Sequence, residues 1–156
     1  MGDLNVFKIP LEKMTLEKLD VHDQRHLKVV EGFRDPLAME MCYDVQLDVK
    51  ALADGREKNS FLVKNNDGYF GYVHISDNID DERVLCYIVQ EKLRGKGLGK
   101  IMLTGVSDYL LDSNFASTLK LYINKSNYIS ANLAVQCGFE KGHYVGADMV
   151  DYYKRK

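Results

Sequence analysis

The chain has 156 residues, of which 46% are apolar and 28% are charged, and its formal net charge at pH 7 is -2. This length is typical of one domain with its own core, so we expect residues 1–156 to form a single domain. The near-neutral charge gives no electrostatic argument for a nucleic-acid partner. No apolar run approaches the roughly 20 residues of a membrane-spanning helix, so we expect a cytoplasmic protein that does not contact membranes.

Three cysteines stand far apart in the sequence, at Cys42, Cys86 and Cys137. None of them forms a pair with the spacing of metal ligands, and this usage is typical of reduced thiols in the core. The sequence therefore predicts neither a metal site nor a disulfide framework.

The first part of the chain predicts a strand, a helical region and a hairpin. A short strand is expected near residues 6–9. Residues 16–53 are expected to be mostly helical, with a break at Asp35-Pro36 because the residue before proline is pushed away from helical angles. Residues 61–64 and 69–76 then predict a hairpin, because Asn65-Asn66-Asp67-Gly68 between them is a strong turn sequence.

The middle of the chain predicts a buried strand followed by an amphipathic helix. Residues 84–89 are apolar on both alternating faces, as in a central strand that is covered on both sides. Leu98, Met102 and Val106 then recur at the spacing of one helix face.

A second strand and helix follow. Residues 119–124 alternate between apolar and polar side chains, which predicts a strand with one buried face. Ser126 or Asn127 is a good first residue for a helix, and Gly138 supplies its stop. One or two closing strands are expected from residue 145 onward. This order of elements indicates an α+β or mixed α/β sheet.

A turn with three alternating glycines joins the central strand to its helix, with the sequence Arg94-Gly95-Lys96-Gly97-Leu98-Gly99-Lys100. Glycine reaches backbone angles that are closed to other residues, so successive N–H groups can point into one concavity. The N-terminus of the following helix and the basic side chains make that concavity more attractive to an anion. The turn therefore predicts a phosphate site.

Two common glycine-rich phosphate loops do not fit this spacing. A P-loop requires glycine at position 94 and Ser or Thr at position 101, where the chain has Arg94 and Ile101. A dinucleotide fingerprint requires glycine at position 100, where the chain has Lys100. What remains is an Arg-x-x-Gly-x-Gly loop formed by Arg94, Gly97 and Gly99.

This loop resembles motif A of the GNAT N-acetyltransferase superfamily, which grips the pyrophosphate of acetyl-coenzyme A. Residues 127–139 resemble motif B of the same superfamily, a helix that starts with Asn-x-x-Ala, continues to a Leu-Tyr pair and closes on Gly-Phe. The residues that match motif B are Asn127, Leu133, Gly138 and Phe139, and Ser130 stands where a small alanine is usual. The resemblance covers about residues 60–155.

The resemblance implies a central mixed, mostly antiparallel sheet that is flanked by helices and contains two splayed parallel strands. Here those strands would end at Val89 and Asn124, and the pantetheine arm would enter the gap between them. The implied activity is transfer of an acetyl group from acetyl-CoA to a primary amine. The acceptor would be a small molecule or a protein, and the enzyme would be a monomer or a homodimer.

The resemblance also implies roles for individual residues. The backbone at Tyr87, Ile88 and Val89 would pair with pantetheine and help to polarise the thioester. The pyrophosphate would be held by Arg94, Gly95, Lys96, Gly97, Leu98, Gly99 and Lys100. The Asn127 side chain would hydrogen-bond the pantetheine arm.

The catalytic groups are less clear, because two positions depart from the family. The tyrosine that protonates the departing thiolate in many members falls at Ala134, and an acidic residue of the preceding strand falls at Tyr122. We expect Glu82, or a water chain that it anchors, to act as the base, although Asp80-Asp81-Glu82 also fits a solvated turn. Tyr128 is the expected acid, with Tyr122 as the alternative.

Two other functions stay open at this point. The chain could bind an acyl-CoA without catalysing transfer, as a sensor or interaction module, which the loss of tyrosine at Ala134 favours. It could also be a nucleotide-binding protein, although the P-loop and dinucleotide spacings disfavour this.

Overall fold

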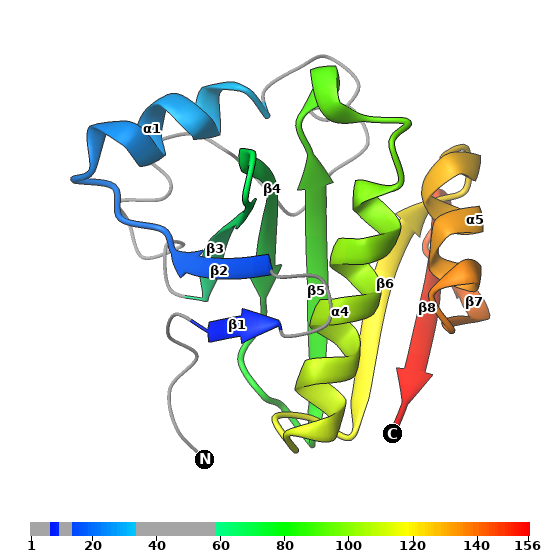
Figure 1. The fold of residues 1–156 in the computed structure, drawn as a ribbon. Coiled ribbons are helices and arrows are strands. Elements are labelled where there is room, and N and C mark those ends of the chain that lie inside the picture. The colour runs from blue at the N-terminus through cyan, green and yellow to red at the C-terminus, as the bar shows by residue number, and fades with distance from the viewer. Residues whose placement is uncertain (1–6, 10–13, 34–58) are drawn as a thin grey trace.

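The computed structural model describes residues 7–9, 14–33 and 59–156 (Figure 1). Their strands form one sheet in the order β1-β2-β3-β4-β5-β6-β8-β7. The strands are β1 (Phe7–Ile9), β2 (Met14–Lys18), β3 (Ser60–Asn65), β4 (Gly68–Ile75), β5 (Glu82–Val89), β6 (Thr118–Asn124), β7 (Glu140–Val145) and β8 (Met149–Arg155). The helices are α1 (Gln24–Glu31), the 3-10 turn η2 (Glu91–Leu93), α4 (Leu98–Asp112) and α5 (Tyr128–Gln136).

Every pair of neighbouring strands is antiparallel except β5 and β6, which are parallel. Parallel neighbours need a crossover connection, and α4 supplies it by running back over the sheet between them (Figure 1). The predicted mixed, mostly antiparallel sheet with one parallel pair is therefore confirmed.

The sheet has a buried cluster on each face. On the α4 face, Phe61 and Val73 pack with Met102 and Leu119 in the larger cluster. On the opposite face, α1 covers a smaller cluster that includes Leu62. Neighbouring residues of β3 thus enter different clusters, as the two-residue repeat of a strand requires. Both faces of the central strands are covered, which explains why residues 84–89 are apolar at successive positions.

The prediction of a mostly helical segment over residues 16–53 was wrong at its start. Residues 14–18 form β2, which pairs with β1 on one side and β3 on the other. Met14 and Leu16 are buried while Thr15 and Glu17 between them are not, so the segment follows the repeat of a strand. The only described helix in this region is α1, and the expected break at Asp35-Pro36 lies outside the described residues.

The other predicted elements are confirmed. The hairpin of β3 and β4 turns at Asn65 and Gly68, and Gly68 has a φ of 121°. The α5 helix begins after Asn127, whose side chain caps it, and the chain leaves the helix through Gly138 at a φ of 91°. None of the helices in the described ranges is long and apolar enough to cross a bilayer.

Candidate functional site

The parallel strands β5 and β6 are paired only at their first residues. The ladder runs from Glu82 opposite Thr118 to Val84 opposite Lys120, and beyond it the two strands diverge (Figure 1). The sheet is thus split towards the carboxyl ends of β5 and β6, as the family resemblance implied.

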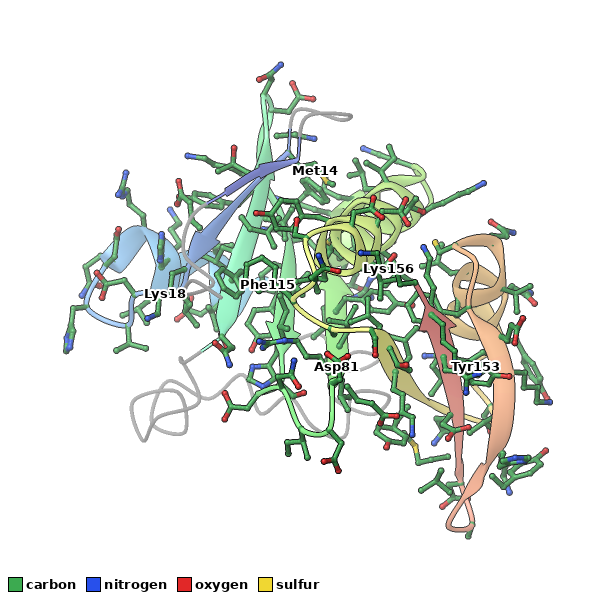
Figure 2. All side chains as sticks on the ribbon, turned by 90° about the horizontal axis from the view of Figure 1, so that it is seen from below. Met14, Lys18, Asp81, Phe115, Tyr153 and Lys156 are labelled. Atoms are coloured by element: carbon green, nitrogen blue, oxygen red, sulfur yellow. The ribbon has the colours of Figure 1, made fainter. Side chains whose placement is uncertain are left out.

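The closed end of this split is tied by backbone carbonyls. The Asp81 carbonyl accepts hydrogen bonds from the N–H groups of Ser117 and Thr118, at 3.0 and 3.3 Å. The Arg83 guanidinium donates to the carbonyls of Phe115 and Ser76, both at 2.9 Å. Figure 2 looks onto this end of the molecule, where Asp81 and Phe115 are labelled. The loops that precede β5 and β6 are therefore bonded to each other directly and through Arg83.

A cleft of about 640 Å³ occupies the split. Its walls come from β5, the start of α4, β6 and α5, and most of their surface is apolar. The lining residues include Val84, Leu85, Cys86, Tyr87, Ile88, Val89, Leu93, Leu121, Tyr122, Ile123, Asn127, Ile129, Ser130 and Leu133. No Asp or Glu side chain is among the described residues that line it. The cleft thus suits a long, mostly uncharged chain.

The glycine-rich turn lies at the open end of the cleft. Gly95 and Gly97 have φ values of 78° and 81°, which other residues rarely adopt, and Gly97 is the N-cap of α4. The Arg94 side chain ties the turn to the end of β5, since its Nε donates to the Val89 carbonyl at 2.9 Å. Lys100 lines the cleft beside these residues. The predicted phosphate loop therefore has the backbone conformation that the glycines suggested.

Two helices begin at the open end, α4 after β5 and α5 after β6. The first N–H groups of a helix have no partner within it, and they carry partial positive charge. Neither helix has an acidic residue in its first turn. The cleft is therefore apolar along its length and attractive to anions at its mouth, which suits a chain with a phosphate-bearing end.

The sequence model of the acetyltransferase (GNAT) family matches residues 29–139. The chain belongs to this family. No curated protein matches the sequence.

Solved GNAT structures share its fold at low sequence identity. Spermidine N-acetyltransferase from Vibrio cholerae, in complex with CoA and spermine, is 18% identical with a TM-score of 0.76, over 91% of this chain and 95% of that one. The aminoglycoside acetyltransferase AAC(6')-Ib, in complex with coenzyme A and kanamycin, is 16% identical with a TM-score of 0.75, over 92% and 95%. The microcin C7 self-immunity acetyltransferase MccE, with acetyl-CoA and AMP, is 15% identical with a TM-score of 0.70, over 95% and 94%.

In this GNAT domain, nearly all of the predicted coenzyme residues lie together in the cleft. Those that line it are Tyr87, Ile88, Val89, Arg94, Gly95, Gly97, Leu98, Gly99, Lys100 and Asn127. Lys96 belongs to the same turn but is exposed and does not line the cleft. The side-chain oxygen of Asn127, Oδ1, already accepts a hydrogen bond from Ser130 N at 3.2 Å, so the side-chain nitrogen, Nδ2, is the end suited to donate to a ligand.

The predicted catalytic residues are not brought together. Glu82 lies at the closed end of the split and forms an ion pair with Lys120, whose pKa is raised by the hydrogen bond to this carboxylate. Glu82 is seven positions before Val89 at the open end, which is about 23 Å along a strand. Tyr128 is the first residue of α5, is 74% exposed and does not line the cleft. Tyr122, the alternative acid, does line it.

Sequence reasoning missed one polar contact inside the cleft. The Tyr87 hydroxyl lies 2.7 Å from Ser130 Oγ, so a hydrogen bond joins β5 to the first turn of α5. The alternation of residues along β5 could have placed Tyr87 on the same face as Leu85 and Val89. Nothing in the sequence could have shown that α5 brings a serine within reach of it.

Proposed function

We propose that the chain transfers an acetyl group from acetyl-CoA to a primary amine, within a single domain over residues 1–156. The observation that carries this proposal is the split between β5 and β6, which opens at a cationic, glycine-rich helix N-terminus. Its apolar walls suit the pantetheine arm and its mouth suits the pyrophosphate. Family membership supplies the acetyltransferase chemistry.

The geometry supports distinct roles for the two ends of the cleft. The turn over residues 94–100 and the start of α4 would hold the pyrophosphate. The backbone at Tyr87, Ile88 and Val89 would pair with the pantetheine arm, and the Asn127 amide would donate to it. The thioester would then lie deeper, where a backbone N–H can stabilise the oxyanion that forms when the amine attacks.

Two of the solved relatives support a primary amine as the acceptor. One was determined with spermine and another with kanamycin, and both compounds carry primary amines. A small polyamine or an amino sugar is therefore the first kind of acceptor to test. The amine must be neutral to attack, and Glu82 stays our proposal for the base, acting through a water chain because its side chain lies beyond the inner end of the cleft.

The test is a thermal-shift titration with acetyl-CoA, CoA, ATP and NAD on the wild type and on a Gly97→Glu variant. Ligand at about 100 times its dissociation constant contributes roughly 2.7 kcal/mol, or about 5 to 10 °C for a chain of this size. We expect this shift in melting temperature only with acetyl-CoA and CoA. The Gly97→Glu variant should lose it, because the new carboxylate would repel the pyrophosphate.

The matched control is Gly146→Glu. Gly97 and Gly146 both have positive φ values, 81° and 70°, and a Cβ on either would meet no atom within 4 Å. The backbone strain of the two variants is therefore similar, but Gly146 lies in the turn between β7 and β8. Gly146→Glu should keep the full shift. Absence of any coenzyme A shift in the wild type would refute the proposal.

A second function, binding of acyl-CoA without transfer, is favoured by two observations. Ala134 is fully buried and has no proton to give, and no carboxylate is among the described residues of the cleft. Release of free CoA from acetyl-CoA, measured with spermidine and kanamycin as acceptors, separates the two functions. Binding without release of CoA would favour the sensor.

A further inference from the structure

The Tyr87 side chain places a hydroxyl group inside the cleft. Tyr87 is in the middle of β5, and its ring packs against the cluster on the α4 face of the sheet. Its hydroxyl ends 2.7 Å from Ser130 Oγ, and both residues line the cleft. Ser130 is itself held in place, because its backbone N–H donates to Asn127 Oδ1. A phenol is thus fixed between one strand wall and one helix wall of the proposed coenzyme site.

The place that this phenol reaches is close to Ala134. Ser130 and Ala134 are four residues apart in α5, so they lie on one side of the helix about one turn, or 5 to 6 Å, apart. The tyrosine hydroxyl that the family resemblance expects from position 134 is replaced by alanine. The structure brings a tyrosine hydroxyl to the neighbouring turn of the same helix from β5 instead.

We propose that Tyr87 protonates the departing thiolate of coenzyme A and that Ser130 orients its hydroxyl. The inference rests on the proposed function. When the tetrahedral intermediate collapses, the carbon–sulfur bond breaks and its electron pair goes to sulfur. The proton of Tyr87 Oη moves to that sulfur, and the phenolate recovers a proton from the surplus one that the attacking amine gives up. The sum is amine plus acetyl-CoA to amide plus CoA thiol.

The other two tyrosines near the cleft are less suited to this role. Tyr128 is 74% exposed and does not line the cleft. Tyr122 lies in β6 between Leu121 and Ile123, which are buried in the cluster on the α4 face, so its side chain leaves the strand on the opposite face from α5. Tyr87 is the one of the three whose hydroxyl contacts α5 inside the cleft.

The test compares binding of CoA with binding of desulfo-CoA, which lacks the sulfur, and it needs no known acceptor. Isothermal titration at pH 9, where part of the free thiol is ionised, gives the ratio of the two dissociation constants. A hydrogen bond from a phenol to a thiolate should make the wild type prefer CoA about tenfold. In Tyr87→Phe the preference should fall below about twofold, with the affinity for desulfo-CoA unchanged.

Three further variants sharpen the comparison. Tyr144→Phe removes a hydroxyl from an exposed tyrosine of β7 and should keep the wild-type ratio. Ser130→Ala should lower the ratio and Ser130→Thr should restore it, because threonine keeps the hydroxyl that orients Tyr87.

The outcomes separate the inference from the proposed function. An equal ratio in wild type and Tyr87→Phe, or no preference for CoA in the wild type, would overturn the role of Tyr87 and leave coenzyme binding intact. Loss of the preference in Tyr128→Phe instead would assign the proton to Tyr128. A wild type that binds neither compound would overturn the proposed function itself.

Discussion

Asn127 uses the two ends of its side-chain amide differently. The carbonyl oxygen caps α5 by accepting from Ser130 N, and the amide nitrogen belongs to a residue that lines the cleft. A helix cap of this kind contributes about 1 kcal/mol to stability. The residue therefore couples the start of α5 to the proposed coenzyme site, and its two roles can be separated by substitution.

We expect Asn127→Asp and Asn127→Ala to differ in stability but not in binding. Aspartate keeps the capping oxygen, so its free energy of unfolding should stay within about 0.5 kcal/mol of the wild type, whereas alanine should lose about 1 kcal/mol. Both lose the amide donor, so both should bind CoA at least about fivefold more weakly. Urea denaturation and titration calorimetry measure the two effects. Wild-type affinity in Asn127→Asp would remove the amide from the coenzyme site.

At the scale of elements, α4 approaches the sheet closely at one glycine of β4. A Cβ added at Gly71 would lie 2.5 Å from Met102 Sδ and 3.4 Å from the Ile88 carbonyl oxygen. Met102 is fully buried in the middle of the cluster between α4 and the sheet. The absence of a side chain at Gly71 therefore sets how near this helix can lie to the strand.

Gly71→Ala should be destabilising because it overpacks this contact, by about 1 to 3 kcal/mol. Met102→Ala alone should cost about 2 to 5 kcal/mol, because it removes buried atoms and leaves a cavity. In the double variant neither Sδ nor Cε is present beside the new methyl group, so the loss of stability should be smaller than the sum of the two single losses by at least about 0.5 kcal/mol. Chemical denaturation of the four proteins measures this. Additive losses would mean that the two side chains do not compete for the same space.

The elements around the cleft could be predicted from the sequence because each has a local signal. The glycines of residues 94–100, the cap at Asn127 and the turn at residues 65–68 all lie where the structure has a turn or a helix start. β2 could not be separated from a helix, because Leu16 and Leu19 are also spaced like one helix face. Its two-residue alternation is only five residues long, and pairing with β3 decides its conformation.

The contact between Tyr87 and Ser130, on which our proposed acid rests, could not be predicted, because it depends on packing between distant segments. Tyr87 and Ser130 are 43 residues apart, and only the packing of α5 beside β5 brings their hydroxyl groups together. Glu82 stands at the start of the central strand, and Tyr128 stands next to Asn127 in the sequence. Proximity in sequence does not carry a side chain to the same end or face of a sheet.

At the scale of the whole molecule, a polar cluster ties the N-terminal elements to the sheet. Glu17 of β2 accepts a hydrogen bond from the Tyr69 hydroxyl at 2.5 Å, lies 3.3 Å from His26 Nε2 and forms an ion pair with Lys64. Burial alone would raise the pKa of Glu17, but the hydrogen bonds of Lys64, Tyr69 and His26 lower it. Burial and the hydrogen bond to Glu17 raise the pKa of Tyr69 from 10.0 to about 12. His26 is only 5% exposed.

Stability should therefore fall at both ends of the pH range. The pKa of Glu17 is lowered on folding, so its contribution is present above its ordinary pKa of 4.5 and is lost as the pH falls below it. The pKa of Tyr69 is raised on folding, so its contribution is complete below pH 10 and is lost as the pH rises from 10 through 12.

Tyr69→Phe should be about 1 kcal/mol less stable than the wild type at pH 7, and this gap should narrow by pH 11. In that interval Tyr69 ionises in the unfolded wild type but not in the folded protein, so the wild type loses a contribution to stability that Tyr69→Phe never had. Urea denaturation at pH 7, 9 and 11 tests this, with Tyr144→Phe as the control that follows the wild type. A gap that stays constant to pH 11 would contradict the raised pKa.

The bonded closed end of the split has a consequence for the kinetics of ligand capture. The carbonyls of Asp81, Phe115 and Ser76 accept the hydrogen bonds that hold the starts of β5 and β6 together, and the ladder between the two strands ends at Val84 and Lys120. The strands that form these walls therefore lose their conformational entropy when the protein folds, and not each time a ligand binds. These hydrogen bonds lie within the protein and do not depend on a ligand, so we expect capture without a preceding rearrangement of the strands, at a rate that rises linearly with ligand concentration.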